Sequence, residues 1–190
     1  MAGFRLGIAF EELTLRLYHT CLLHDLGWTT TVEGLTHPAH AMTFELHDAF
    51  MVYEHLHAVA PAFDAEQVGD IVQSITLHTS QWSSGNSSAT GLLMALTVAF
   101  DAFGYDSPGP GGLNYSLLFN TMTVQEIEEH CPRNDFFVEG SETFERESTE
   151  KPKQVFCLSG GLDALLKGFL VGPIVPKIVP EESRARNVWP

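Results

Sequence analysis

The sequence contains few basic residues for its length. Its 190 residues include 10 Lys and Arg against 24 Asp and Glu, which gives a formal net charge of -14 at pH 7. Proteins that bind nucleic acid neutralise phosphates with clustered Lys and Arg, and this chain has no such basic footprint. Nucleic acid is therefore not an expected partner.

Cysteine is also scarce, and apolar runs of membrane length are missing. Cys21, Cys131 and Cys157 are odd in number and form no Cys-x-x-Cys pair, so a cysteine-type zinc site has no support. No apolar run is long enough to span a bilayer, and the N-terminus has no recognisable secretory signal. We expect a soluble protein in the reduced cytoplasm, with no membrane partner.

What the chain does have is helical periodicity, with apolar residues making up 44% of its length. Asp64 with Gln67 and Thr123 with Glu126 fit the capping-box pattern, and Ser88 suits an N-cap. No βαβ alternation is present, so we predict an all-α chain of five or six helices. The expected helices cover residues 5–24, Phe44 to Val59, Asp64 to His78, Ala89 to Phe103, Thr123 to Cys131 and 159–170.

Three stretches are expected to lie outside the helical core. Residues 28–41, rich in Thr and His, are predicted to form a loop, and residues 173–190 an extended exposed end. The acidic run from Glu126 to Glu150 is expected to be a solvated surface.

The dipeptide His24-Asp25 ends the first predicted helix. Leu13, Leu17, Thr20 and His24 are spaced by four, three and four residues, which places the imidazole on the inward face. An ionised carboxylate buried without compensation costs several kcal/mol. A divalent metal is one of the few partners that satisfies a buried imidazole and carboxylate together.

Other histidines have weaker claims to a chemical role. His47-Asp48 lies on an amphipathic helix with Glu45 and Glu54 nearby, and we expect it to be a solvated pair. His37 and His40 in a Thr- and His-rich loop are expected to be ordinary surface residues, although they could add ligands. His55 and His57 are also expected on the surface.

Asp101 and His78 are the two further candidates for the site. Asp101 lies in the apolar run that begins at Leu92, where a carboxylate is costly unless a cation, a metal or several donors meet it. Metal ligation and an internal hydrogen bond or ion pair both remain open for this residue. His78 ends an apolar helical face and is either a satisfied core residue or the wall of a polar pocket.

These residues carry a resemblance to a known family. Tyr18 to Thr30 resembles the central motif of the HD-domain superfamily, and its run from Thr20 to Asp25 is similar to the fungal cyanamide hydratase branch. The similarity continues through Met42 to Glu45, Ile75 to His78 and Ala99 to Asp101. It covers roughly Leu13 to Pro152.

The resemblance implies an HD-domain helical bundle over residues 1–152, followed by a divergent tail at 153–190. It also implies a divalent ion, zinc in this branch with iron or manganese as alternatives, held by His24, Asp25 and Asp101. The family's first histidine lies on a helix upstream of the pair, whereas His19 here is one turn away. The chain thus supplies three of the four ligand positions, and three protein ligands can hold a catalytic metal.

By this resemblance the chain is a hydro-lyase that adds water to the nitrile carbon of cyanamide, a small neutral substrate, and gives urea. The metal would supply hydroxide, Asp25 and His78 would be the catalytic residues, and Thr29, Thr30 and Phe44 would form the substrate pocket. Two alternatives are an HD-type phosphohydrolase and a degenerate, inactive HD domain. Arg16 is the only Lys or Arg between Leu6 and Glu129, which counts against an anionic substrate. Assembly into a homo-oligomer stays open.

Overall fold

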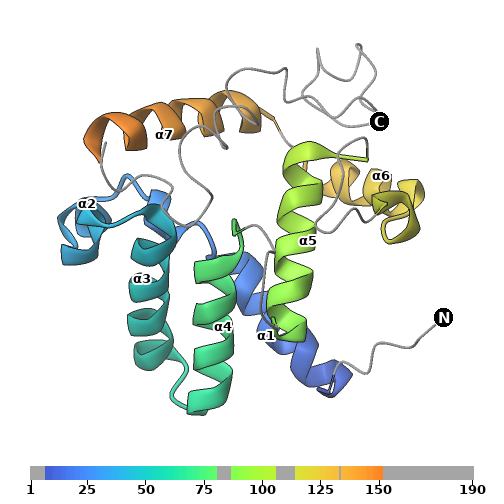
Figure 1. The fold of residues 1–190 in the computed structure, drawn as a ribbon, viewed down its shortest axis with the longest axis horizontal. Helices are drawn as coiled ribbons and strands as arrows, with labels where there is room; N and C mark the ends of the chain where they lie inside the picture. The colour runs from blue at the N-terminus through green and yellow to red at the C-terminus, as the bar shows by residue number, and fades with distance from the viewer. Residues whose placement is uncertain (1–6, 81–86, 106–113, 133, 152–190) are drawn as a thin grey trace.

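The computed structural model describes residues 7–80, 87–105, 114–132 and 134–151, and the regular secondary structure in this part of the chain is all helical (Figure 1). It contains seven α-helices and no strand, so the all-α prediction is confirmed for the described residues. None of these helices is long and apolar enough to cross a membrane. The helices are α1 (Phe10–Leu23), α2 (Val32–Thr36), α3 (Phe44–Val59), α4 (Ala65–Leu77), α5 (Ala89–Phe103), α6 (Thr121–His130) and α7 (Phe136–Glu150).

The centre of the fold is an antiparallel pair, α3 and α4, with α5 beside α4 and α1 crossing behind α4 and α5 (Figure 1). Their contact surfaces are apolar because apolar residues recur along each helix at helical spacing. One core cluster contains Leu23, Val52, Leu56, Val68, Ile71 and Ile75. A second joins α5 to α6 through Leu96, Phe100, Tyr115 and Val124.

The caps explain why several helices begin where the sequence predicted. Asp64 and Gln67 form both hydrogen bonds of a capping box at the start of α4, and Ser88 accepts a hydrogen bond from Gly91 N–H at the start of α5. The predicted span from Ala89 to Phe103 is confirmed. The cap predicted at Thr123 is wrong, because Asn120 caps α6 three residues earlier in the chain.

Other predicted boundaries need correction. The first helix begins at Phe10 rather than at residue 5, and residues 28–41 contain α2 and the 3-10 helix η2 (Pro38–Ala41) instead of a plain loop. Thr31 accepts a hydrogen bond from Gly34 N–H and so initiates α2. The predicted helix over 159–170, the extended end and the boundary after residue 152 lie outside the described residues.

Helix α7 occupies the acidic run that was expected to be solvated. Most described acidic side chains of the run are exposed, as predicted, including Glu126, Glu129 and Glu139. The prediction is wrong for Glu128 on α6 and for Glu147, which is buried one turn from Phe144. A helix that packs one face inward buries whichever residues lie on that face, charged ones included. Figure 1 shows α7 lying across one end of the α3–α4 pair, which we call the α7 end of the bundle.

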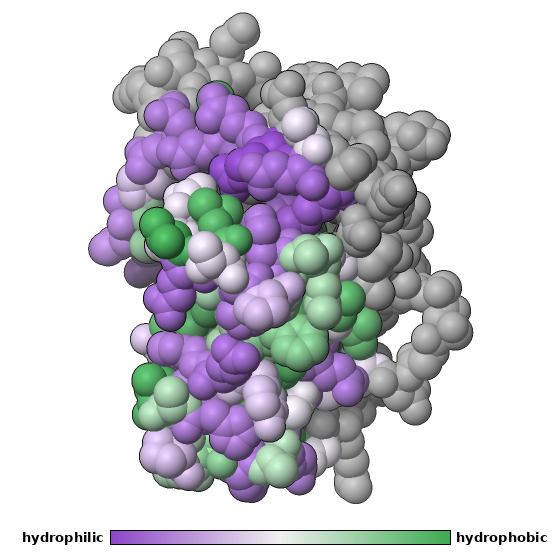
Figure 2. Space-filling model, turned by 90° about the vertical axis from the view of Figure 1, so that its left-hand side faces the viewer, coloured by the Kyte–Doolittle hydropathy of each residue, from purple (hydrophilic) through white to green (hydrophobic). Residues whose placement is uncertain are grey.

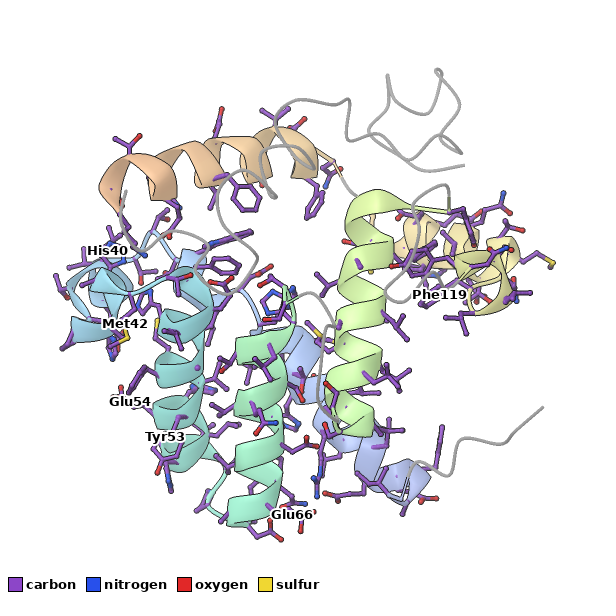
Figure 3. The ribbon with its side chains drawn as sticks, viewed as in Figure 1. His40, Met42, Tyr53, Glu54, Glu66 and Phe119 are labelled. Atoms are coloured by element: carbon purple, nitrogen blue, oxygen red, sulfur yellow. The ribbon has the colours of Figure 1, made fainter. Side chains whose placement is uncertain are left out.

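On the outer face of α2 and α3, small clusters of hydrophobic residues lie among hydrophilic residues (Figure 2). Figure 3 shows His40 at the α7 end and Glu66 at the opposite end of α4.

Candidate active site

Buried polar side chains are concentrated at the α7 end of the bundle. Charged residues are rarely fully buried unless they are paired, so a group of this size marks a candidate site. The buried polar members are Thr43, Glu45, His47, Asp48, His78, Glu147 and Lys151. Of these residues the sequence predicted only His78 as a site residue, and it assigned His47 and Asp48 to the solvated surface. The polar residues in the first turns of α3 were an available signal.

His24 and Asp25 contact each other where α1 ends. Their Nε2 and Oδ2 atoms are 3.1 Å apart, and His24 Nδ1 donates a hydrogen bond to the Cys21 carbonyl at 2.9 Å. The side chains are 25% and 44% exposed, so the prediction of a buried pair is wrong. The chain leaves the helix at His24, and this places Asp25 on the rim of the site instead of in the core.

His78 lies beside this pair at the end of α4. Its Nδ1 donates to the Ile75 carbonyl at 2.5 Å, and its ring centroid is 5.3 Å from that of His24, edge to face. Burial lowers the pKa of His78 to about 4, and the neighbouring His24 contributes to the shift. His78 is therefore neutral near pH 7, with Nε2 as its hydrogen-bond acceptor.

Asp101 is exposed in the last turn of α5, contrary to the burial predicted from its apolar neighbours. The helix ends two residues later at Phe103, where Gly104 adopts a positive φ of 71° and turns the chain. The last turn of a helix can be exposed to solvent even when the middle of the same helix is buried in the core. Within the described ranges, no three His, Cys, Asp or Glu side chains are grouped so that they could hold a metal ion.

The donor set at the α1 terminus therefore fits part of a zinc site. His24 Nε2 and Asp25 Oδ2 are close enough to share one cation. The Cys21 carbonyl accepts a hydrogen bond from the other ring nitrogen and so orients the imidazole, as is common for histidines that bind metals. Zinc in proteins takes at least three protein ligands, and the described residues bring two together. Coordination of a metal by His24, Asp25 and Asp101 stays a prediction.

The three predicted pocket residues differ in their placement. Phe44 is buried, with its ring 5.9 Å from that of His78 and 4.4 Å from that of Trp28. Thr29 Oγ1 lies 2.9 Å from Thr31 Oγ1, at the start of α2, and Thr30 is exposed. The structure thus brings Phe44 to the candidate acid–base residues by a direct contact.

His47 and Asp48, which the sequence predicted to be solvated, are both fully buried. The reason is the 3-10 helix η1 (Leu26–Trp28), which lies across the first turns of α3 and covers them. Burial raises the pKa of Asp48 well above its usual value and lowers the pKa of His47 to about 4. Asp48 Oδ2 and His47 Nε2 are buried without a hydrogen-bond partner among the described residues.

His37 and His40 extend the group around His47, so the prediction that they are ordinary surface residues is wrong. The ring of His37 stacks on His47 at 5.5 Å, and the ring of His40 meets it edge to face at 5.3 Å. His37 Nε2 lies 3.2 Å from Glu54 Oε2. The placement of His55 and His57 on the surface is confirmed.

Two buried carboxylates complete the site. Glu45 accepts hydrogen bonds from the hydroxyls of Thr43 and Thr79, the latter at 2.8 Å and directly after His78 in the chain. Glu147 of α7 pairs with Lys151 at 2.7 Å, and both are buried. Burial raises the pKa of Glu147 even though Lys151 lowers it in part.

Comparison with known proteins adds no family to this geometry. No protein-family model matches the chain, and no curated protein matches it either.

Proposed function

We propose that this chain is a hydratase that adds water to a small uncharged nitrile such as cyanamide and gives urea. The contact between His24 and Asp25, with the neutral imidazole of His78 beside it, carries the proposal. The resemblance of the surrounding sequence to the cyanamide hydratase branch of the HD-domain superfamily supplies the substrate class.

We propose that the His24–Asp25 pair shares one transferable proton. A carbonyl only accepts, so the contact with Cys21 requires a hydrogen on His24 Nδ1. Nε2 and Asp25 Oδ2 would then face each other as two acceptors at 3.1 Å unless a proton lies between them. A proton held at a half-exposed rim is available to a substrate.

His78 is suited to orient the water. Its Nδ1 hydrogen is occupied by the Ile75 carbonyl, which leaves Nε2 to accept a hydrogen bond. Its lowered pKa keeps it neutral at pH 7, so it does not repel a proton that leaves the water. A fixed acceptor next to a proton-carrying pair places the water oxygen for attack.

The steps balance without a further reactant. The water oxygen bonds to the nitrile carbon while Asp25 takes one water proton and His24 gives its Nε2 proton to the nitrile nitrogen. The product, isourea, tautomerises to urea. Transfer of the new proton from Asp25 to His24 restores the starting pair.

An uncharged substrate agrees with the charges around the site. Arg16, the only Lys or Arg between Leu6 and Glu129, is bonded to Glu12, Glu66 and Asp70, and Lys151 is paired with Glu147. A phosphate group requires cations that are not already neutralised. Among the described residues Arg146 of α7 is the third cation, and its guanidinium donates to the Trp28 carbonyl at 3.4 Å. Carboxylates thus neutralise two of the three described cations, which favours an uncharged substrate over a phosphate.

The test is urea release from cyanamide by the full chain, measured for wild type and for His24→Ala, Asp25→Asn and His78→Ala. Removing a positioned acid or base lowers the rate by about a hundredfold or more. His55→Ala, at an exposed position on α3, should keep the wild-type rate. Equal rates for wild type and His24→Ala would contradict the proposal.

A second candidate is a non-catalytic HD-like domain. The exposed position of Asp101 favours it, because two of the predicted metal ligands meet without the third. For this candidate, neither cyanamide nor a panel of nucleotides would be consumed by the folded chain. Nucleotide hydrolysis without urea release would instead favour the phosphohydrolase.

A further inference from the structure

We infer that His47 and Asp48 are positioning residues: they hold the backbone of Gly27 from both sides and thereby fix the turn that carries Asp25. The catalytic consequence rests on the proposed function, whereas the positioning itself does not. The sequence contains two His-Asp pairs, and this inference makes the second pair the support of the first.

The contacts involve both backbone polar groups of one residue. Gly27 N–H donates to Asp48 Oδ1, and His47 Nδ1 donates to the Gly27 carbonyl at 3.1 Å. Both side chains are fully buried, so water cannot easily replace either bond. We call these three residues the Gly27 clamp.

The approach of η1 to α3 is so close that it requires glycine at position 27. A Cβ atom there would lie 2.6 Å from the Phe44 carbonyl oxygen and 2.9 Å from the Asp48 backbone nitrogen. Both obstacles are backbone atoms of the first turns of α3, which cannot rotate away. Gly27 is thus the residue that lets two adjacent side chains of one helix reach both of its backbone groups.

The clamp connects to the catalytic pair through one turn. Trp28 N–H donates to the Asp25 carbonyl at 3.1 Å, and this hydrogen bond closes the turn of residues 25–28. His24 is held separately, by the Cys21 carbonyl within α1. The position of Asp25 relative to His24 therefore depends on where the clamp holds this turn.

Matched substitutions separate a positioning role from simple filling of the core. Asn at position 47 carries its amide N–H near the place of Nδ1, whereas Gln carries it one bond further out and cannot reach the Gly27 carbonyl. Asn at position 48 keeps an acceptor for Gly27 N–H, and Ala removes it. His55→Gln, on the exposed side of the same helix, is the control.

The first measurement, on the full chain, is hydrogen exchange of the Gly27 and Trp28 amides, together with the imidazole NMR signals of His24. We expect His47→Gln and Asp48→Ala to speed exchange at Gly27 by about tenfold or more and to shift the His24 signals, while amides of α4 stay protected. His47→Asn, Asp48→Asn and His55→Gln should stay close to wild type. If Asp48→Ala fails to fold, the comparison of His47→Gln with His47→Asn still tests whether the clamp holds the turn.

The second measurement is urea release by the same variants. We expect kcat to fall by about tenfold or more in His47→Gln with little change in KM, and to recover in His47→Asn. If wild type releases no urea, the proposed function fails, yet the exchange rates and the His24 signals still test the clamp. Folded His47→Gln and Asp48→Ala with wild-type exchange at Gly27 and unchanged His24 signals would overturn the inference.

Discussion

Arg16 donates to Asp70 across 3.1 Å, and this contact joins α1 to α4. Asp70 Oδ2 also accepts a hydrogen bond from the Thr90 hydroxyl of α5 at 2.7 Å, so one carboxylate links three helices. Arg16 is buried and completes its contacts with Glu12 at 2.7 Å. Arg16, the only Lys or Arg between Leu6 and Glu129, thus holds the bundle together.

Replacing Arg16 with Met should lower the free energy of unfolding by about 2–4 kcal/mol, because the largely buried Asp70 carboxylate loses its cation. Urea denaturation followed by far-UV circular dichroism measures the change. Glu66→Gln is the control, since the Glu66 side chain is 83% exposed and its contact with Arg16 should contribute less than about 0.5 kcal/mol. Equal stability of the two variants would show that the network is not a structural support.

The stability of the protein should depend on pH through His47. Its pKa in the folded chain is about 4, below the ordinary value of 6.5, so the unfolded chain binds more protons between these values. The resulting stabilisation is complete above pH 6.5 and is lost as the pH falls toward 4. His47→Asn should therefore lose less unfolding free energy than wild type between pH 7 and pH 5, by about 1–2 kcal/mol.

The same denaturation curves for His55→Asn provide the control for this pH effect. His55 is exposed on α3, so its removal should leave the wild-type pH dependence in place. A His47→Asn protein with the wild-type slope between pH 7 and pH 5 would mean that His47 is not buried in solution.

Two glycines should respond to alanine in opposite ways. Gly27→Ala forces a Cβ against backbone atoms of α3 and should destabilise the fold by about 2 kcal/mol or more. Gly69→Ala lies within α4, where a Cβ meets nothing within 4 Å, and should stabilise it by about 0.5–1 kcal/mol. Thermal unfolding of both variants measures the difference, and a tolerated alanine at position 27 would contradict the close approach of η1.

Where apolar spacing and caps agree, the sequence predicts the helices well. The spans of α3 and α5 were predicted from this agreement, with Pro61 after α3 and Ser88 before α5. Helix α7 was missed because its sequence is mostly charged and polar, and only a few of its side chains, such as Phe144, pack inward. Its formation depends on contacts with residues far away in the chain, which periodicity does not report.

The site shows a similar limit. The meeting of His24 with Asp25 follows from adjacency, and the burial of His78 follows from its place on an apolar face. The burial of His47 and Asp48 depends on η1, which arrives from residues about 20 positions earlier and lies across α3. Local sequence cannot distinguish the covered His-Asp pair from a solvated one, so the two pairs exchanged their expected environments.

Zinc binding is the remaining test of the predicted ligand set. The family resemblance predicts that Asp101 completes the set. The structure instead places this residue at an exposed helix end, and the described residues contain no group of three possible metal ligands. We expect His24→Ala to weaken zinc binding by about tenfold or more, and Asp101→Ala to change it little. Competition with a chromophoric chelator measures the affinity, with Glu11→Gln in α1 as an exposed acidic control. If Asp101→Ala lost both zinc binding and urea release while Glu11→Gln kept both, Asp101 would be established as the third ligand. The C-terminal end of α5 would then have to move toward α1.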